Sequence, residues 1–313
     1  MPRKKSVPPP APPPPPALKS GFIAIVGRTN VGKSTLLNQA LGKKVSIISD
    51  KPQTTRTRIL GVHTTAAGQM VFFDTPGVHR PGHELNRQMV QHIHHALQGA
   101  DAVLQVIDIS ESFGHGEQYV LDLVRAAGRP AVLAINKIDL VKKSRILEVI
   151  DFYRQRHAYA AYVPVSALTG DGVPALVGEL FGLLPPGEFF YDESFITDSP
   201  DRFMAAELVR EQVLQHTRQE LPFSTGVLVD LWDEARRETD GLLRIEASIL
   251  VERDSQKGIL IGRQGGMLKT IGSAARREIE AYLGCRVFLG LFVKVEADWR
   301  NNIYILQQMG VVR

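Results

Sequence analysis

Residues 27–34 of this chain read Gly27-Arg28-Thr29-Asn30-Val31-Gly32-Lys33-Ser34. An apolar, β-branched run at 22–26 precedes them and predicts a buried strand, while residues 35–41 have helical composition and end at Gly42. A strand, a loop of the form G-x4-G-K-S and a helix together predict a phosphate-binding P-loop. In such a loop, successive backbone N–H groups and the positive end of the helix dipole face one anion.

Two side chains of the loop add chemistry to this prediction. The ammonium of Lys33 can reach the β- and γ-phosphates of a nucleotide, and the hydroxyl of Ser34 can bind Mg2+, a hard ion that prefers oxygen. The alternative is a glycine-rich turn between a strand and a helix that matches by chance. Motifs later in the chain separate these two interpretations.

The composition is that of an ordinary globular protein, with 44% hydrophobic and 22% charged residues in a chain of 313, a length that allows two domains. The net charge of +4 equals the charge of Arg3, Lys4, Lys5 and Lys19, since residues 1–20 contain no acid. The remainder of the chain is formally neutral. A surface for RNA or membrane must therefore come from the placement of charges rather than from their excess.

Residues 1–19 are predicted to form a disordered basic tail, because residues 7–17 are almost entirely proline and alanine and cannot bury a core. A docking site for a proline-binding partner is the alternative interpretation of this tail. No apolar run approaches the roughly 18–20 residues that cross a bilayer, and the start lacks the apolar core of a signal peptide. The single Cys285 excludes an intrachain disulfide, and together these features predict a cytoplasmic protein.

Short apolar runs alternate with helix-like stretches from residue 20 to residue 185, which predicts an α/β domain with a mostly parallel, doubly wound sheet. The runs at 59–62 and 70–73 are separated only by a short loop through Gly68, and they predict a hairpin that makes one edge strand antiparallel. In full, the apolar runs lie at 22–26, 59–62, 70–73, 102–107, 131–135 and 162–165, and the helix-like stretches at 84–98, 117–127, 145–156 and 174–183.

Three short motifs follow predicted strands in the order expected after a P-loop: Asp74-Thr75-Pro76-Gly77, Asn136-Lys137-Ile138-Asp139 and Ser166-Ala167-Leu168. Asp74 can hold a water of Mg2+, and Gly77 can donate its N–H to a γ-phosphate. Alone, each motif is also compatible with an ordinary turn or a charged loop. Together, at the strand ends where a doubly wound sheet binds its ligands, they predict a GTPase-type site.

The second of these motifs predicts the base. The two carboxylate oxygens of Asp139 can accept hydrogen bonds from N1–H and N2–H2 of guanine, and adenine lacks this pair of donors. Asn136 and the stem of Lys137 are predicted to brace the base and the P-loop. We therefore predict GTP rather than ATP as the nucleotide.

Residues 51–58, with the sequence KPQTTRTR, lie between the first helix and the hairpin, where a segment that senses the γ-phosphate is expected. A threonine hydroxyl in this stretch can complete the ligands of Mg2+. Taken alone, the stretch is only a polar loop.

The sequences GRTNVGKS, QTTRTR, DTPGV, NKID and SAL are similar to those of the Era family of bacterial ribosome-associated GTPases. The resemblance implies Thr55 as the switch threonine on Mg2+. It also implies that Val78 occupies the position at which Ras-like enzymes carry the glutamine that orients the attacking water. GTPases with an apolar residue there and with asparagine at the position of Asn30 can use K+ near the phosphates, so K+ is a further predicted cofactor.

The predicted site residues follow from these motifs and from the resemblance. Catalytic roles are assigned to Lys33, Thr55 and Gly77, and Mg2+ binding to Ser34, Thr55 and Asp74. The predicted nucleotide-binding residues are Gly27, Arg28, Thr29, Asn30, Val31, Gly32, Lys33, Ser34, Thr35, Asp74, Thr75, Pro76, Gly77, Asn136, Lys137, Asp139, Ser166, Ala167 and Leu168.

A linker is predicted at 186–200 and a second domain at 201–313. The pattern of the second domain is a helix at 203–214, strands at 227–231 and 242–251, a Gly-x-x-Gly loop at 262–265 with helical turns on both sides, a helix at 267–282 and a strand at 286–295. The order αββααβ, with the loop between the two middle helices, is that of an α+β type II KH domain, here with its core at about 212–293.

The glycines of such a loop let a single-stranded RNA backbone approach closely and be clamped over about four nucleotides. From residue 255 to residue 277 the chain contains five cations and no acid, which supplies the local basic surface that bulk composition does not. The alternative for the loop is a simple helix–helix turn. The predicted RNA-binding residues are Lys257, Gly262, Arg263, Gln264, Gly265, Lys269, Arg276 and Arg277.

The sequence thus predicts a monomeric GTPase that uses Mg2+ to hydrolyse GTP to GDP and phosphate. The resemblance covers residues 20–313, and it implies binding of the 3′ end of 16S ribosomal RNA during assembly of the 30S subunit, with peripheral contact to the cytoplasmic face of the cell membrane. Two alternatives stay open. One is an RNA-binding scaffold with little GTP turnover, which Val78 favours, and the other is a membrane-associated GTPase whose KH-like domain contacts protein.

Overall fold

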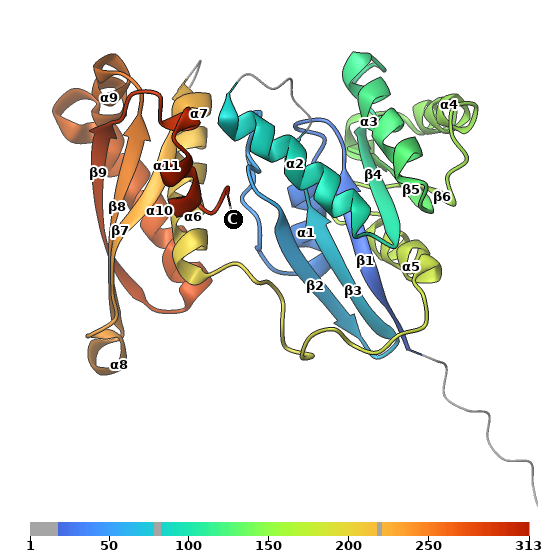
Figure 1. Ribbon diagram of the computed structural model, residues 1–313, viewed down its shortest axis with the longest axis horizontal. Helices are drawn as coiled ribbons and strands as arrows, with labels where there is room; N and C mark the ends of the chain where they lie inside the picture. Colours follow the sequence, from blue (N-terminus) through green and yellow to red (C-terminus); the bar gives the residue numbers. More distant parts are fainter. Residues whose placement is uncertain (1–17, 78–82, 218–220, 313) are drawn as a thin grey trace, which may run out of the picture.

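The computed structural model describes residues 18–77, 83–217 and 221–312. It contains a six-stranded sheet with helices on both faces and a three-stranded sheet against which helices pack (Figure 1). We call residues 18–185 the N-terminal unit and residues 201–312 the C-terminal unit. Most of the predicted tail and Val78 lie outside the described residues.

The six-stranded sheet has the order β2-β3-β1-β4-β5-β6. All neighbours pair in parallel except β2 and β3, which form the predicted antiparallel hairpin with β2 at the edge. The doubly wound sheet predicted from the sequence is therefore confirmed. Its strands are β1 (Lys19–Val26), β2 (Ile59–Thr65), β3 (Gly68–Asp74), β4 (Ala102–Asp108), β5 (Ala131–Asn136) and β6 (Ala161–Pro164).

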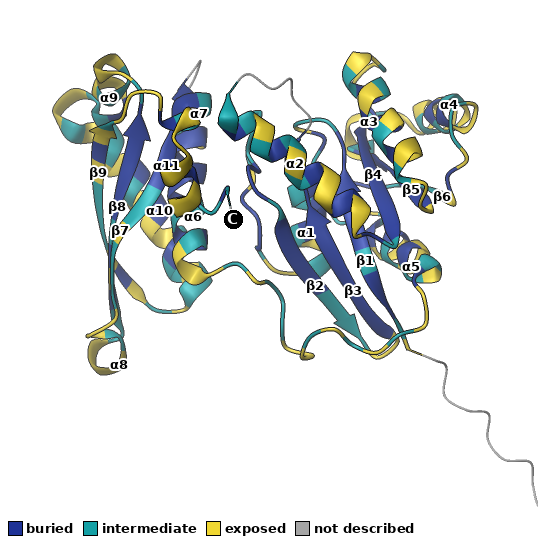
Figure 2. Cartoon of the chain, in the orientation of Figure 1, coloured by how far each residue is buried: buried dark blue, intermediate teal, exposed yellow. Residues whose placement is uncertain are grey.

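Helices cover both faces of this sheet, so its central strands are buried on both sides (Figure 2). Along β1, Ile23 and Ile25 pack toward one set of helices, and Ala24 and Val26 pack toward the other. This alternation is the two-residue period of a strand, and the continuous apolar run is what a parallel sheet covered on both faces requires. One face carries α1 (Lys33–Leu41) and α5 (Val173–Leu183), and the other carries α2 (Glu84–Gln98), α3 (His115–Ala127) and α4 (Lys143–Arg154).

The C-terminal unit has the predicted order αββααβ, in which β8 pairs antiparallel with β7 and parallel with β9. Its main elements are α6 (Asp201–His216), β7 (Gly226–Asp233), β8 (Leu242–Val251), α9 (Asp254–Ile261), α10 (Gly266–Leu283) and β9 (Arg286–Val295). Short helices add to this order, and none of them is long enough to show a helical period in the sequence. They are α7 (Leu221–Ser224), α8 (Arg237–Asp240), α11 (Ile303–Gln308) and the 3-10 helices η2 (Arg263–Gly265) and η3 (Trp299–Asn301). In the N-terminal unit, the 3-10 helix η1 (Ile138–Leu140) follows β5.

Apolar side chains join the two units at two places. Ile47 of the N-terminal unit is 2% exposed and belongs to the core formed by α6, α10 and the three-stranded sheet. Leu85 and Met89 of α2 pack with Trp299 and Leu306 near the C-terminus. Among the described helices, none combines the length and apolar character needed to cross a membrane.

Candidate functional site

The P-loop runs from the end of β1 to the start of α1, at the centre of the six-stranded sheet. Gly32 has a φ of 94°, and a Cβ there would lie 2.3 Å from Nδ2 of Asn136, so only glycine fits this position. Asn136 donates a hydrogen bond from Nδ2 to the carbonyl oxygen of Val31 at 2.7 Å and accepts one at Oδ1 from the N–H of Ala167 at 2.9 Å. Three predicted motifs thus meet at one asparagine.

Lys33 lies inside this loop and is only 6% exposed. Its ammonium donates hydrogen bonds to the carbonyl oxygens of Gly27 at 3.1 Å and Arg28 at 2.7 Å. Burial lowers the pKa of Lys33 to about 8, although the negative charges of Asp74 and Glu117 oppose this change. The side chain therefore stays mostly protonated at neutral pH, and it supplies a poorly solvated positive charge within the loop.

Hydroxyl and carboxylate oxygens converge next to Lys33. Oγ of Ser34 donates to Oδ2 of Asp74 at 2.6 Å and lies 2.9 Å from Oγ1 of Thr55. Asp74 is fully buried, and its Oδ1 has no hydrogen-bond partner among the described residues. Burial raises the pKa of Asp74, although Lys33 and hydrogen bonds from three hydroxyls oppose this effect.

The oxygen atoms of Ser34, Thr55 and Asp74 are suitable ligands for Mg2+. The ion takes oxygen ligands at about 2.0–2.1 Å in an octahedron, so neighbouring ligands lie roughly 2.9 Å apart. That is the separation of the Ser34 and Thr55 hydroxyls. The unsatisfied oxygen of Asp74 provides a buried acceptor for a water of the ion. The three residues predicted to bind Mg2+ are therefore brought together.

The cavity over the P-loop holds only about 50 Å3, which is room for a few water molecules. Residues 44–57, which we call the switch segment, cover it through Ile47, Ile48, Thr54 and Thr55. Oδ1 of Asn38 on α1 accepts hydrogen bonds from the N–H groups of Val45 and Ser46, which fixes the start of the segment. The switch segment therefore forms one wall of the cavity over the P-loop.

The side of the site predicted to hold the base is open. Asp139 is exposed, and its carboxylate has no hydrogen-bond or ion-pair partner among the described residues. Nζ of Lys137 lies 2.5 Å from Oδ2 of Asp108, which holds the lysine beside the site rather than in solvent. In the third motif, Ser166 and Ala167 are buried, and Leu168 is 78% exposed.

The side chains of some predicted nucleotide-binding residues contact other parts of the protein and stabilise the fold around the site. The guanidinium of Arg28 leaves the loop and pairs with Glu111 at 2.9 Å. Oγ1 of Thr75 donates to the carbonyl oxygen of Ile25 at 2.7 Å. Gly77 lies against the P-loop, where a Cβ would come within 2.4 Å of Cγ2 of Thr29. The side chains of Thr29, Asn30 and Thr35 line the cavity.

The sequence interpretation missed two residues near Lys33. Oγ of Ser46 donates to Oδ2 of Asp74 at 3.2 Å, from a position that no motif marks. Glu117 on α3 is 4% exposed, and its Oε2 has no hydrogen-bond partner among the described residues. Burial raises the pKa of Glu117 to about 7, although the positive charge of Arg28 opposes this rise. An acid in an amphipathic helix gave no sign of this burial.

The Gly-x-x-Gly loop of the C-terminal unit joins α9 to α10, as predicted. Gly262, Gln264 and Gly265 have φ values of 69°, 52° and 77°, so the loop turns through three left-handed residues. Arg263, Gln264, Lys269, Arg276 and Arg277 are exposed, and Lys257 is half-buried. Among the described residues, no acid pairs with any of the five predicted cations Lys257, Arg263, Lys269, Arg276 and Arg277.

Comparisons with known proteins match both units of the chain. Residues 22–137 match the family model described as a 50S ribosome-binding GTPase, and residues 230–300 match that of a KH domain. The GTPase Era of Geobacter metallireducens is 49% identical over 292 residues, which cover 93% of this chain and 97% of that protein. The GTPase Era of Geotalea uraniireducens is 47% identical, also over 93% of this chain and 97% of that protein.

Solved structures give the same result. A variant of Aquifex aeolicus Era bound to GDP and AlF4− is 39% identical, with 95% of this chain and 100% of that chain covered and a TM-score of 0.90. Era in complex with MgGDPNP and nucleotides 1506–1542 of 16S ribosomal RNA is also 39% identical, with the same 95% and 100% coverage and a TM-score of 0.91. The resemblance seen in the motifs is confirmed, and the chain belongs to the Era family of GTPases.

Proposed function

We propose that this chain binds GTP with Mg2+, hydrolyses it to GDP and phosphate, and binds single-stranded ribosomal RNA through its C-terminal unit. The observation that carries the proposal is the convergence of the Ser34, Thr55 and Asp74 oxygens beside the buried ammonium of Lys33. In our assignment, residues 20–185 form the GTPase domain, 186–200 the linker and 201–313 the KH domain. The related Era structures bound to MgGDPNP and to GDP and AlF4− support the choice of nucleotide.

Hydrolysis joins a water oxygen to the γ-phosphorus and breaks the bond between that phosphorus and the bridging oxygen of GDP. The ammonium of Lys33 stabilises the negative charge on the transferring group, and the Gly77 N–H donates to the γ-phosphate. Ser34, Thr55 and Asp74 would hold Mg2+ through their oxygen atoms. When bound, the ion neutralises charge on the β- and γ-phosphate oxygens. Asn30 near the phosphates supports K+ as an additional cation.

Base selection rests on Asp139, whose open carboxylate accepts two hydrogen bonds from guanine. Asp139→Asn places an amide donor against one of the two guanine donors. Affinity for GTP should then fall about tenfold to hundredfold, and xanthosine triphosphate, with a carbonyl at that position, should bind better than GTP. Titration of both nucleotides into the variant tests the assignment, and an unchanged preference for GTP would refute it.

For the RNA, we propose the 3′ end of 16S ribosomal RNA, on the 30S subunit during its assembly. The complex of a related Era with nucleotides 1506–1542 supports this choice. The five cations around the Gly-x-x-Gly loop support RNA binding independently. They have no acidic partner among the described residues and can therefore pair with the phosphates of an RNA. We further propose that the protein works in the cytoplasm and contacts the cell membrane peripherally through its basic N-terminus.

GTP hydrolysis measured with and without RNA of this sequence tests the whole proposal. We expect turnover in both conditions and a faster rate with RNA. GTP binding without turnover in either condition would favour the RNA-binding scaffold instead. Liposome flotation beside an RNA-binding assay tests the remaining alternative, in which the membrane rather than RNA is the main partner.

A further inference from the structure

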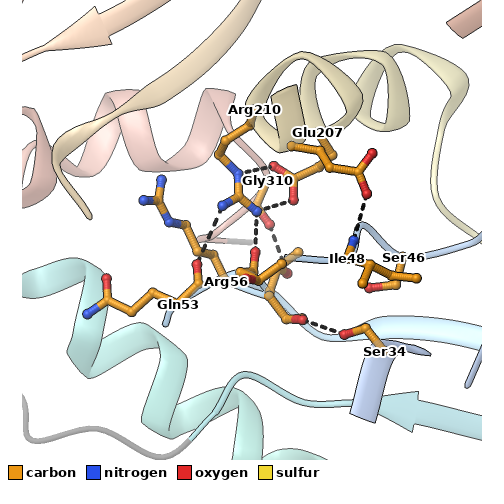
Figure 3. Close-up of polar contacts among 12 residues, drawn as sticks. Ser34, Ser46, Ile48, Gln53, Arg56, Glu207, Arg210 and Gly310 are labelled. Atoms are coloured by element: carbon orange, nitrogen blue, oxygen red, sulfur yellow. Dashed lines mark hydrogen bonds and ion pairs between the residues drawn. The ribbon is translucent and has the colours of Figure 1, made fainter. Parts of the chain in front are cut away.

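Side chains of helix α6 in the C-terminal unit form hydrogen bonds with the backbone of the switch segment in the N-terminal unit (Figure 3). The guanidinium of Arg210 reaches the main chain of the segment, and it is fully buried. Its Nη2 donates to the carbonyl oxygen of Thr54, and its Nη1 donates to that of Gln53 at 3.4 Å. Glu207, one turn earlier on α6, accepts from Nε at 2.7 Å and holds the guanidinium in place.

The residue that follows these carbonyls is Thr55, the proposed Mg2+ ligand. A peptide unit is planar, so fixing the carbonyl of Thr54 also fixes the N–H of Thr55 and the plane from which its Cα continues. Gln53 has a φ of 62°, a left-handed conformation that an isolated glutamine rarely adopts. The hydrogen bonds from Arg210 stabilise this turn. They therefore set the position from which Thr55 reaches Ser34.

The next residue is also held by the C-terminal unit. Arg56 is buried, its Nη1 donates to the carbonyl oxygen of Thr225 at 2.7 Å, and its guanidinium lies 5.6 Å from the ring centroid of Trp299. Thr55 is thus bracketed by two residues whose partners belong to the other unit. This leaves its backbone few alternative conformations while the units are docked.

The start of the switch segment is held by Glu211, the neighbour of Arg210. Oε1 of Glu211 accepts from the N–H of Ile48 at 2.7 Å, and Oε2 accepts from Nζ of Lys44 at 2.7 Å. Burial by itself would lower the pKa of Lys44. The hydrogen bonds from Lys44 to Glu211 and Glu278 outweigh this effect, so its pKa is raised. Between these anchors, Ile47 inserts into the core of the C-terminal unit. The segment is therefore attached to that unit at both ends.

We infer that Arg210 is a positioning residue for nucleotide sensing: docked on the switch segment, it holds Thr55 where Mg2+ and the γ-phosphate require it. The inference rests on the proposed GTPase function. It couples the order of the switch segment to its local contact with α6 rather than to docking of the C-terminal unit in general. A γ-phosphate then favours this contact by the same factor by which the contact favours GTP over GDP.

The test compares full-length variants for their affinity for a non-hydrolysable GTP analogue and for GDP, each with saturating Mg2+ and with a chelator. For Arg210→Gln we expect the Mg2+-dependent preference for the analogue to fall about tenfold, as for the loss of a buried charged hydrogen bond. GDP affinity should stay within about twofold, because the switch segment is ordered through the γ-phosphate. Arg210→Lys, which keeps one cationic donor group, should recover part of the preference.

The matched control is Asn301→Ala. Oδ1 of Asn301 accepts from the N–H of Glu84 at 2.9 Å, so this variant also removes a contact between the units but leaves the switch segment untouched. Hydrogen exchange of amides 48–56 should accelerate in Arg210→Gln and not in Asn301→Ala. Thermal unfolding establishes that each variant is folded. Should Arg210→Gln not fold, Arg210→Lys takes its place, with a severalfold fall in preference expected.

A folded Arg210 variant with the preference and exchange of the unaltered protein would overturn the inference and leave the proposed function standing. An equal loss in Asn301→Ala would also overturn it, since any weakening of docking would then suffice. An unaltered protein that binds neither nucleotide would overturn the proposed function itself.

Discussion

The two glycine-rich loops of this protein differ in the solvent exposure of their cationic side chains. The P-loop at 27–34 encloses its cation, because Lys33 is 6% exposed and donates to two carbonyl oxygens of the loop. The loop at 262–265 and the first turns of α10 present their cations outward. Arg263 of the loop and Lys269 of α10 are exposed and have no acidic partner among the described residues. Both loops use glycine to bring backbone close to phosphate, yet only one is a closed site.

This difference separates recognition of a small ligand from recognition of a polymer. In a poorly solvated site a charge interacts strongly, so a few fixed groups can bind and activate one phosphate chain. On an exposed surface each charge is screened, and affinity is a sum of many small terms that depend on salt. Substitutions in the two loops should therefore differ in size and in salt dependence.

The largest effect is expected at the enclosed cation. Lys33→Met keeps an apolar stem of similar size but removes the charge that stabilises the transferring phosphoryl group. GTP hydrolysis should fall about 100- to 1000-fold, as when one preorganised donor to a developing charge is lost. Single-turnover hydrolysis measures this rate, and RNA affinity of the same variant serves as the control. A loss of only a few-fold would show that the closed loop does not concentrate its effect in Lys33.

The next effect concerns the buried acid beside the P-loop. The pKa of Glu117 is about 7 in the folded protein, against its usual 4.5. The folded state therefore keeps this proton when the unfolded state has released it, so the free energy of unfolding should decrease as pH rises from 4.5 to 7. The decrease due to Glu117 should reach up to about 3 kcal/mol and then stay constant.

Glu117→Gln removes this titration, and the variant should exceed the unaltered protein in stability by up to about 3 kcal/mol at pH 8 and match it near pH 4. Denaturant unfolding of both proteins across this range gives the difference, in which other titrating groups cancel. A difference that does not change with pH would contradict the assignment. No comparable effect is expected from Lys269→Gln on α10, beside the open loop.

A smaller effect is expected on the open loop, where the structure selects the position to change. A Cβ at Gly262 would lie 2.7 Å from Cβ of Met267, so any substitution there distorts the loop itself. A Cβ at Gly265 meets no described atom within 4 Å, and Asn and Asp are the side chains that best tolerate its φ of 77°. Gly265→Asp and Gly265→Asn thus form a pair that differs only in charge.

Gly265→Asp should bind single-stranded RNA about tenfold more weakly than Gly265→Asn, because one like charge faces the phosphates across a partly solvated gap. Fluorescence anisotropy at fixed salt measures both affinities. GTP affinity should be equal in the two variants, since the nucleotide site is in the other unit. Equal RNA affinities would place the RNA site away from this loop.

The smallest effect is expected for single exposed cations. Lys269→Gln should lower RNA affinity only a few-fold and reduce the slope of log affinity against log salt by about 0.7, the contribution of one phosphate contact on a single strand. Lys143→Gln, an exposed lysine on α4 of the other unit, is the matched control and should leave the slope unchanged. A loss of a hundredfold from Lys269 alone would mean that this surface acts as a closed site.

Features of this protein that depend on a few neighbouring residues were predictable from the order of amino acids. A P-loop needs glycine at fixed positions between a strand and a helix, and a strand needs a run of apolar residues with a period of two. Both requirements are local, so they appear directly in the order of amino acids. Strands β8 and β9 accordingly lie at 242–251 and 286–295, as predicted, and the Gly-x-x-Gly loop joins the two helices where it was expected.

Contacts between residues far apart in the chain could not be predicted in this way and are seen only in the folded protein. Arg210 and Thr54 are 156 positions apart, and nothing in the amphipathic pattern of α6 distinguishes an arginine that contacts a carbonyl from one that faces water. From its position in the sequence, Ile47 would be expected to pack within the N-terminal unit. In the structure it belongs to the core of the C-terminal unit. Such contacts depend on how two folded units pack, and packing is a property of surfaces that no local period or motif encodes.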